Sequence, residues 1–208
     1  MCIRDRDYIY GSLSNKGGEN PLDYPAIAAN PAEIITVATN ALTGEAKYFD
    51  KSDIAQDNYD IIKASCSIPL ACPPYMVKGT PYYDGALSDP IPVEKAFFMG
   101  CDKVVLILTR PKDFRRKPGK DRLIASGIRR KYPRAAARME QRADNYNALL
   151  DQAVSLEHQG RILIIALDDI CGMDTLTRDK DAMERFYKKG LRDGGAISLY
   201  LKNDVIPK

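Results

Sequence analysis

The sequence predicts an α/β sandwich of three layers, because apolar strand-like runs alternate with amphipathic helices. Val104–Leu108 and Ile162–Leu167 are continuous apolar runs, the pattern of strands covered on both faces in a parallel sheet. Between these runs, Pro133 begins a long helix whose apolar residues recur at intervals of four and three, and so share one face. They are Met139, Ala143, Tyr146, Leu150 and Ala153.

The other elements are shorter. Gly17-Gly18, Pro21 and Pro25 interrupt any periodicity, so we expect a loop over residues 15–30. In chain order there follow a strand at 34–39, a turn at Thr43-Gly44, a strand at 46–49, a helix at 59–65, a hairpin at 75–83 around Lys78-Gly79, a helix at 92–100 and a strand at 103–109. Near the end, Thr177, Asp179 and Asp181 predict a helix start, and Lys188-Lys189-Gly190 predicts its end or a bend before residues 196–201.

Composition favours one compact globular unit. A chain of 208 residues suits a single domain. No apolar run approaches the roughly 18 residues that a membrane-spanning helix needs. Five cysteines form no Cys-x-x-Cys pair, so neither a disulfide framework nor a zinc site is expected. The simplest expectation for the compartment is the reducing cytoplasm.

The basic residues are concentrated in residues 110–142. Thirteen Lys or Arg side chains lie there against Asp113, Asp121 and Glu140, whereas the whole chain carries a net charge of only +3. Such a segment suits peripheral contact with anionic lipid headgroups, at the inner face of a membrane. The alternative, a solvated loop and helix face, is the commoner origin of such charge. Nucleic-acid binding is not expected, because no aromatic interleaving accompanies the charge.

A motif with possible chemistry runs from Tyr82 to Pro92, Tyr-Tyr-Asp-Gly-Ala-Leu-Ser-Asp-Pro-Ile-Pro. It places Asp84 at the end of the hairpin's second strand, beside the small residues Gly85 and Ala86. A carboxylate in this position can accept a proton from a hydroxyl nucleophile, and small neighbours let the backbone turn and a substrate approach. An Asp-Gly turn without a catalytic role is the alternative.

This motif resembles the Asp-Gly-Gly/Ala segment of the patatin-like phospholipases. The preceding Ala64-Ser-Cys-Ser-Ile-Pro-Leu-Ala-Cys-Pro-Pro74 is similar to that family's helix end and Pro-containing loop, and the helix and strand expected over residues 92–109 follow in the family's order. The resemblance starts near Asp7 and is strongest over residues 34–111. It implies a three-layer α/β/α sandwich with a mostly parallel central sheet. It also implies a lipid acyl hydrolase with a Ser-Asp dyad, Asp84 as the dyad carboxylate, a phospholipid or other acyl-ester substrate, and no metal or organic cofactor.

The nucleophile of such a dyad is absent from this chain. None of its serines lies in a Gly-x-Ser-x-Gly elbow, and no Gly-rich turn could supply an oxyanion hole. We therefore expect the fold to be incomplete at the N-terminus. We interpret residues 1–6 as a non-native scar and residues 7–208 as the C-terminal portion of a patatin-like domain. The competing interpretation is a non-catalytic lipid-binding or regulatory protein with the same fold.

Four other polar residues need an interpretation. Asp89 stands where the family usually carries Asn, and we expect it to support the Asp84 loop. His158 is the only histidine, and its place after a long helix needs no catalytic explanation. Ser65 and Ser67 are near Asp84 in sequence but on no elbow, so we expect them to bond local backbone groups. Acyl chain, headgroup and oligomeric state are not encoded in recognisable motifs.

Overall fold

The computed structural model describes residues 3–168 and 179–202. It divides into two compact units, the first formed by residues 1–90 and 117–146 and the second by residues 91–116 and 147–208. The sequence predicts one compact unit instead. Two units form because the strands assemble into two separate sheets, of four strands and two strands. The assignment of residues 7–208 to one patatin-like domain stays a prediction.

The first unit contains an antiparallel sheet of four strands in the order β2-β1-β4-β3. Its strands are β1 (Thr36–Asn40), β2 (Ala46–Phe49), β3 (Tyr75–Val77) and β4 (Thr80–Asp84). Short connections join β1 to β2 and β3 to β4, and such connections permit only antiparallel pairing. In the β3–β4 turn, Lys78 and Gly79 have φ angles of 48° and 80°, as a hairpin turn of the I′ type requires. The predicted hairpin is confirmed, whereas the mostly parallel central sheet is not.

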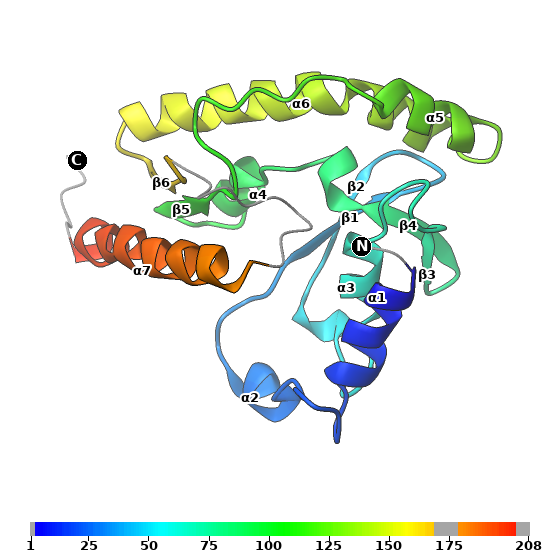
Figure 1. The fold of residues 1–208 in the computed structure, drawn as a ribbon, viewed down its shortest axis with the longest axis horizontal. Helices are drawn as coiled ribbons and strands as arrows, with labels where there is room; N and C mark the ends of the chain where they lie inside the picture. The colour runs from blue at the N-terminus through cyan, green and yellow to red at the C-terminus, as the bar shows by residue number, and fades with distance from the viewer. Residues whose placement is uncertain (1–2, 169–178, 203–208) are drawn as a thin grey trace. The chain divides into compact units, whose positions relative to one another are not determined.

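Helices cover both faces of this sheet (Figure 1). Tyr82 and Tyr83 are neighbours on β4, so they point to opposite faces. Tyr82 packs into the core cluster that contains Ile61 and Ala64 of α3 (Asp60–Ser65). Tyr83 packs into a second cluster with residues of α5 (Asp121–Arg129) and of the first turns of α6 (Pro133–His158). The first unit therefore has a helix, sheet and helix layering.

The N-terminal part of this unit contains α1 (Ile3–Tyr8), the π-helical turn η1 (Ile9–Leu13) and α2 (Tyr24–Ala29). The loop predicted for residues 15–30 is wrong over α2. The Asp23 side chain accepts a hydrogen bond from the Ala26 amide (3.0 Å), and Pro25 lies in the first turn, where a helix tolerates proline. Arg6 lies within the predicted scar, yet its side chain is buried and donates to Ser67 Oγ (2.7 Å).

The second unit contains a parallel strand pair with helices. Its elements are α4 (Val93–Phe98), β5 (Val104–Ile107), β6 (Ile162–Ile165) and α7 (Lys180–Lys202). The parallel pairing of β5 with β6 confirms the prediction for the two apolar runs. Burial on both faces is wrong for Ile107, whose side chain is 67% exposed. None of the helices in the described ranges is long and apolar enough to span a membrane.

The two long helices were predicted with different success. Helix α6 begins at Pro133, as predicted, and of its expected apolar face only Tyr146 is not fully buried. The predicted stop or bend at Lys188-Lys189-Gly190 is wrong, because α7 continues through it. Asp179 caps α7 by accepting hydrogen bonds from the Asp181 amide (2.9 Å) and the Ala182 amide (3.2 Å). Thr177 lies outside the described residues.

We predict that Met139→Ala lowers the free energy of unfolding by about 2–5 kcal/mol, because the side chain is fully buried between α6 and the sheet. Chemical denaturation measures this loss. Met183→Ala is the matched control, since Met183 on α7 is 40% exposed and should change stability by less than about 0.5 kcal/mol. Equal losses for both variants would contradict the burial assigned to Met139.

Candidate active site

Asp84 is the last residue of β4 and pairs in register with Ala38 of β1. Its half-buried side chain caps the short 3-10 helix η3 (Gly85–Leu87), because Oδ1 accepts a hydrogen bond from the Ala86 amide at 2.8 Å. The Asp84 amide donates to the Ser67 carbonyl at 2.9 Å. The carboxylate therefore lies at a strand end, as predicted, with its side chain and its backbone both held.

Gly85 lets the chain turn directly over β1. A Cβ atom at this position would lie 2.4 Å from the Val37 carbonyl oxygen, a distance that no side chain tolerates without backbone movement. The Gly85 carbonyl in turn accepts a hydrogen bond from the Asp89 amide at 2.9 Å. Glycine at this position is therefore required by the close approach of two backbone segments.

Three polar side chains that the sequence did not single out hold the turn. The buried Thr39 Oγ1 of β1 donates to the Asp84 carbonyl at 2.8 Å, and it lies 2.8 Å from Ser88 Oγ. Asn145 of α6 donates from Nδ2 to the Ser88 carbonyl at 3.1 Å. The sequence carries no signal for Thr39, because its burial and its partners arise only in the tertiary fold. Nothing in the sequence marks Asn145, because its partner lies 57 residues away.

Asp89 supports this loop through a partner from β2. Its Oδ2 accepts a hydrogen bond from the Tyr48 hydroxyl at 2.5 Å. Asp89 thus ties the end of the loop to the edge strand β2.

The serines near Asp84 have structural partners. Ser67 is fully buried; its Oγ donates to the Lys63 carbonyl at 2.8 Å and accepts from Arg6, so the expectation of local backbone bonding is confirmed for this residue. Cys66 lies close enough for the Asp84 charge to act on it. Burial, with a smaller contribution from Asp84, raises the pKa of the Cys66 thiol, although a hydrogen bond with Tyr10 opposes the shift. A thiol held neutral in this way is a poor nucleophile.

The other candidate residues are the histidine, possible metal ligands and the cysteines. His158 is exposed at the C-terminal end of α6, in the second unit. Residues 3–168 and 179–202 contain no group of three or more His, Cys, Asp or Glu side chains arranged to hold a metal ion. Within the same ranges Cys66, Cys72 and Cys101 are free thiols.

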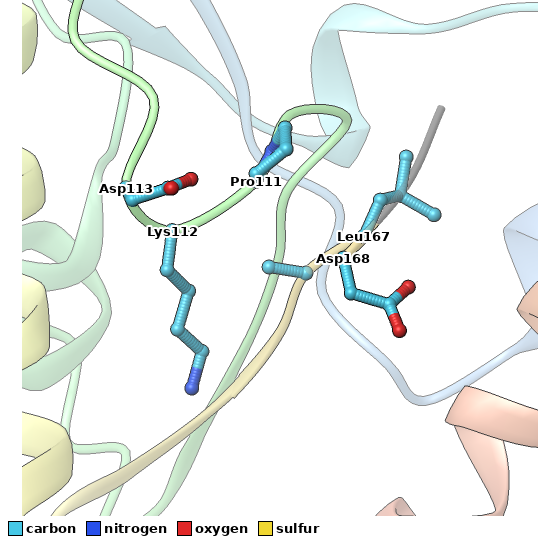
Figure 2. A pocket seen from close by; sticks show the side chains of 6 residues that line it. Pro111, Lys112, Asp113, Leu167 and Asp168 are labelled. Atoms are coloured by element: carbon cyan, nitrogen blue, oxygen red, sulfur yellow. The ribbon is translucent and has the colours of Figure 1, made fainter. Parts of the chain in front are cut away.

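A cavity of about 380 Å³ lies in the second unit, past the carboxyl ends of β5 and β6 (Figure 2). Crevices at the carboxyl ends of parallel strands are common ligand sites. Two of its three charged side chains are already engaged: Lys112 Nζ lies 2.6 Å from Glu157 Oε2, and Asp168 pairs with Lys189. The lining residues are Pro111, Lys112, Asp113, Ala166, Leu167 and Asp168. None of them belongs to the unit that contains Asp84.

The first unit thus presents a held carboxylate on an Asp-Gly-Ala turn at the end of a sheet strand. Residues 6–97, which include the whole turn, match the family model of the patatin-like phospholipases. The resemblance predicted from the motif is therefore confirmed for this segment. The match associates it with lipid acyl hydrolysis. A second model, a domain of unknown function (DUF6363), matches residues 132–203, which include α6, β6 and α7.

We predict that Gly85→Ala lowers the free energy of unfolding by about 1–3 kcal/mol, because the new methyl group meets the rigid backbone of Val37. Thermal or chemical unfolding measures the change. Gly194→Ala in α7 is the matched control, since its Cβ meets nothing within 4 Å, and alanine there should be neutral or stabilising by up to about 1 kcal/mol. A neutral Gly85→Ala variant would contradict the close approach.

Stability at high pH should report on Tyr83, next to Asp84. Burial, and secondarily the neighbouring Tyr132, raises the pKa of Tyr83 to about 12, above the value of about 10 of an unfolded chain. Between these two values the unfolded state has lost a proton that the folded state keeps, so stability falls as pH rises. Denaturation at stepped pH should show a shallower fall for Tyr83→Phe. An identical slope would argue against this assignment.

Proposed function

We propose that the chain contributes the general base of a lipid acyl hydrolase, with Asp84 as the carboxylate of a Ser-Asp dyad. The observation that supports this most directly is the held position of Asp84 at the end of β4, inside the segment that matches the patatin-like family. The partners are a phospholipid or another acyl ester. Neither a metal nor an organic cofactor takes part in the proposed reaction.

In the proposed reaction, the Asp84 carboxylate accepts the proton of a serine hydroxyl while the serine oxygen attacks the ester carbonyl. The bond to the leaving alcohol breaks, the proton passes to that alcohol, and an acyl-serine remains. Water, deprotonated by the same carboxylate, then attacks the acyl carbon; the bond to the serine oxygen breaks, the serine takes back the proton, and the fatty acid is released. Because the 208 residues contain no Gly-x-Ser-x-Gly elbow, the nucleophile and oxyanion donors come from a segment outside this sequence.

The proposal also covers membrane contact and binding partners. Residues 110–142 are proposed to contact anionic membrane lipid from the cytoplasmic side, and nucleic acid is not a proposed partner. The alternative function is a non-catalytic lipid-binding or regulatory protein. The observation in its favour is that the Asp84 carboxylate already caps η3, a role that needs no serine.

The test is a fusion in which the serine elbow of an active patatin-like enzyme precedes residue 7. We predict hydrolysis of a nitrophenyl ester by the fusion and none by the 208-residue chain. Asp84→Asn in the fusion should lower the rate by about 10²- to 10⁴-fold, because asparagine keeps the cap oxygen but cannot accept the proton. His158→Ala is the control and should leave the rate nearly unchanged.

Melting temperatures must be compared alongside, because a rate lost through unfolding says nothing of mechanism. A fusion that folds and stays inactive would favour the non-catalytic alternative. An active fusion in which Asp84→Asn has no effect, and His158→Ala is folded and inactive, would replace the dyad with a histidine-based triad.

A further inference from the structure

Leu123 of α5 and Leu70, which packs against Gly127 of the same helix, are both exposed. Leu123 is 67% exposed and lies one helical turn before Gly127 on the same side of the helix. Leu70, in the loop that follows α3, is 58% exposed, and its Cδ2 lies 2.7 Å from the position that a Cβ of residue 127 would take. Glycine at 127 therefore leaves room for the Leu70 side chain to rest on the helix.

Leu70 occupies this place at a cost. Its φ angle is +68°, in the left-handed region that bulky side chains avoid. The turn after Pro69, closed by a hydrogen bond from the Cys72 amide to the Ile68 carbonyl (2.9 Å), favours this conformation, but burial does not account for a leucine in it. Local rules are usually broken in this way where a residue serves a function, and a large apolar side chain held out into solvent suits contact with an apolar phase.

Exposed basic residues lie on and next to α5, the helix that carries Leu123. Lys120, Arg122 and Arg130 are exposed, and no ion pair within the described ranges involves them. Other members of the basic segment are paired: Arg129 with Glu140, Arg142 with Asp121, and Arg115 with Asp151. The exposed Lys117, Lys131 and Arg134 also make no ion pair within these ranges, so the unpaired positive charge continues past both ends of α5. We call Leu70, Lys120, Arg122, Leu123, Gly127 and Arg130 the Leu70–Leu123 face.

The opposite side of α5 packs beside the candidate active site. Ala125 and Ile128 share a core cluster with Tyr83 and Leu87, which bracket the Asp84 turn. The loop of Leu70 also contains Ser67, whose carbonyl accepts the Asp84 amide. One helix and one loop therefore connect the Leu70–Leu123 face to Asp84.

We propose that the Leu70–Leu123 face binds an anionic lipid surface, with the two leucines in the interfacial region and the three cations on headgroup phosphates. Charge complementarity selects this occupant, and apolar side chains at the centre of the cations distinguish it from a phosphate-only ligand such as nucleic acid. The inference rests on the proposed function only in taking lipid as the substrate. Binding would bring that substrate to the unit that contains Asp84.

Vesicle binding by the full chain tests the proposal. The chain should co-sediment with phosphatidylcholine vesicles that contain phosphatidylglycerol, more weakly with pure phosphatidylcholine, and less as salt rises. Arg122→Gln with Arg130→Gln should weaken binding about 30-fold, since each basic residue at such a surface contributes about 1 kcal/mol. Arg185→Gln with Arg192→Gln, on exposed residues of α7, is the charge-matched control and should change binding little.

Insertion of the leucines has its own readout, because the chain contains no tryptophan. Leu123→Trp fluorescence should shift to the blue when anionic vesicles are added, and Leu199→Trp fluorescence should not, although Leu199 is 68% exposed. Asp84→Asn should bind vesicles like the unchanged chain, so failure of the catalytic proposal leaves this result intact.

Four outcomes would overturn the inference. They are no vesicle binding by the unchanged chain, equal binding to neutral and anionic vesicles, equal losses in the two charge variants at unchanged melting temperature, and a Leu123→Trp spectrum that vesicles do not shift. A single-stranded RNA that binds where vesicles do not would assign the basic residues to nucleic acid instead. If the fusion that carries the serine elbow is active and any of these results is obtained, only the proposed membrane-binding role of the Leu70–Leu123 face is contradicted.

Discussion

The packing of Gly85 against the Val37 backbone is the constraint on which the candidate site depends. Because no side chain fits between the two segments, the chain leaving β4 must cross directly over β1. That crossing brings the Asp84 carbonyl and Ser88 Oγ within hydrogen-bonding distance of the Thr39 hydroxyl. The residue that carries the strand-end carboxylate is thus held through its backbone by neighbouring segments.

The alternation of Tyr82 and Tyr83 gives this turn support from both faces of the sheet. Tyr82 contacts Phe49 edge to face at 5.1 Å between ring centroids, and Tyr83 contacts Tyr132 in the same way at 5.7 Å. The turn therefore stands between two packed cores, and a change in either is transmitted to Asp84. Through Tyr83, the helix α5, whose outer face is basic, also packs next to the candidate site.

The sequence could predict those structural features that depend on residues close together in the chain. The β3–β4 hairpin follows from Lys78-Gly79, the strand-end place of Asp84 follows from that hairpin, and the long helix follows from its apolar period. The sequence could not predict the pairing of β1 with β4, because antiparallel partners 42 to 46 residues apart leave no local signal. Helix α5 was missed although Ile124, Ala125 and Ile128 recur at helical spacing among its basic residues, and α2 was missed because proline was taken as a breaker where it begins a helix. Thr39 and Asn145 act on the turn only through the tertiary fold.

The structural and catalytic roles considered for Asp84 are compatible. An ionised carboxylate offers about four acceptor sites, so accepting a hydrogen bond from the Ala86 amide is compatible with accepting a serine proton. That bond restricts the side-chain rotamer, and a general base gains from a fixed orientation because a misplaced carboxylate must reorganise before each proton transfer. A capping aspartate is therefore a suitable starting point for a base. A catalytic Asp-Gly turn then differs from an ordinary one in that a serine hydroxyl reaches the carboxylate. Within this motif, the small residues Gly85 and Ala86 leave space for that hydroxyl to approach.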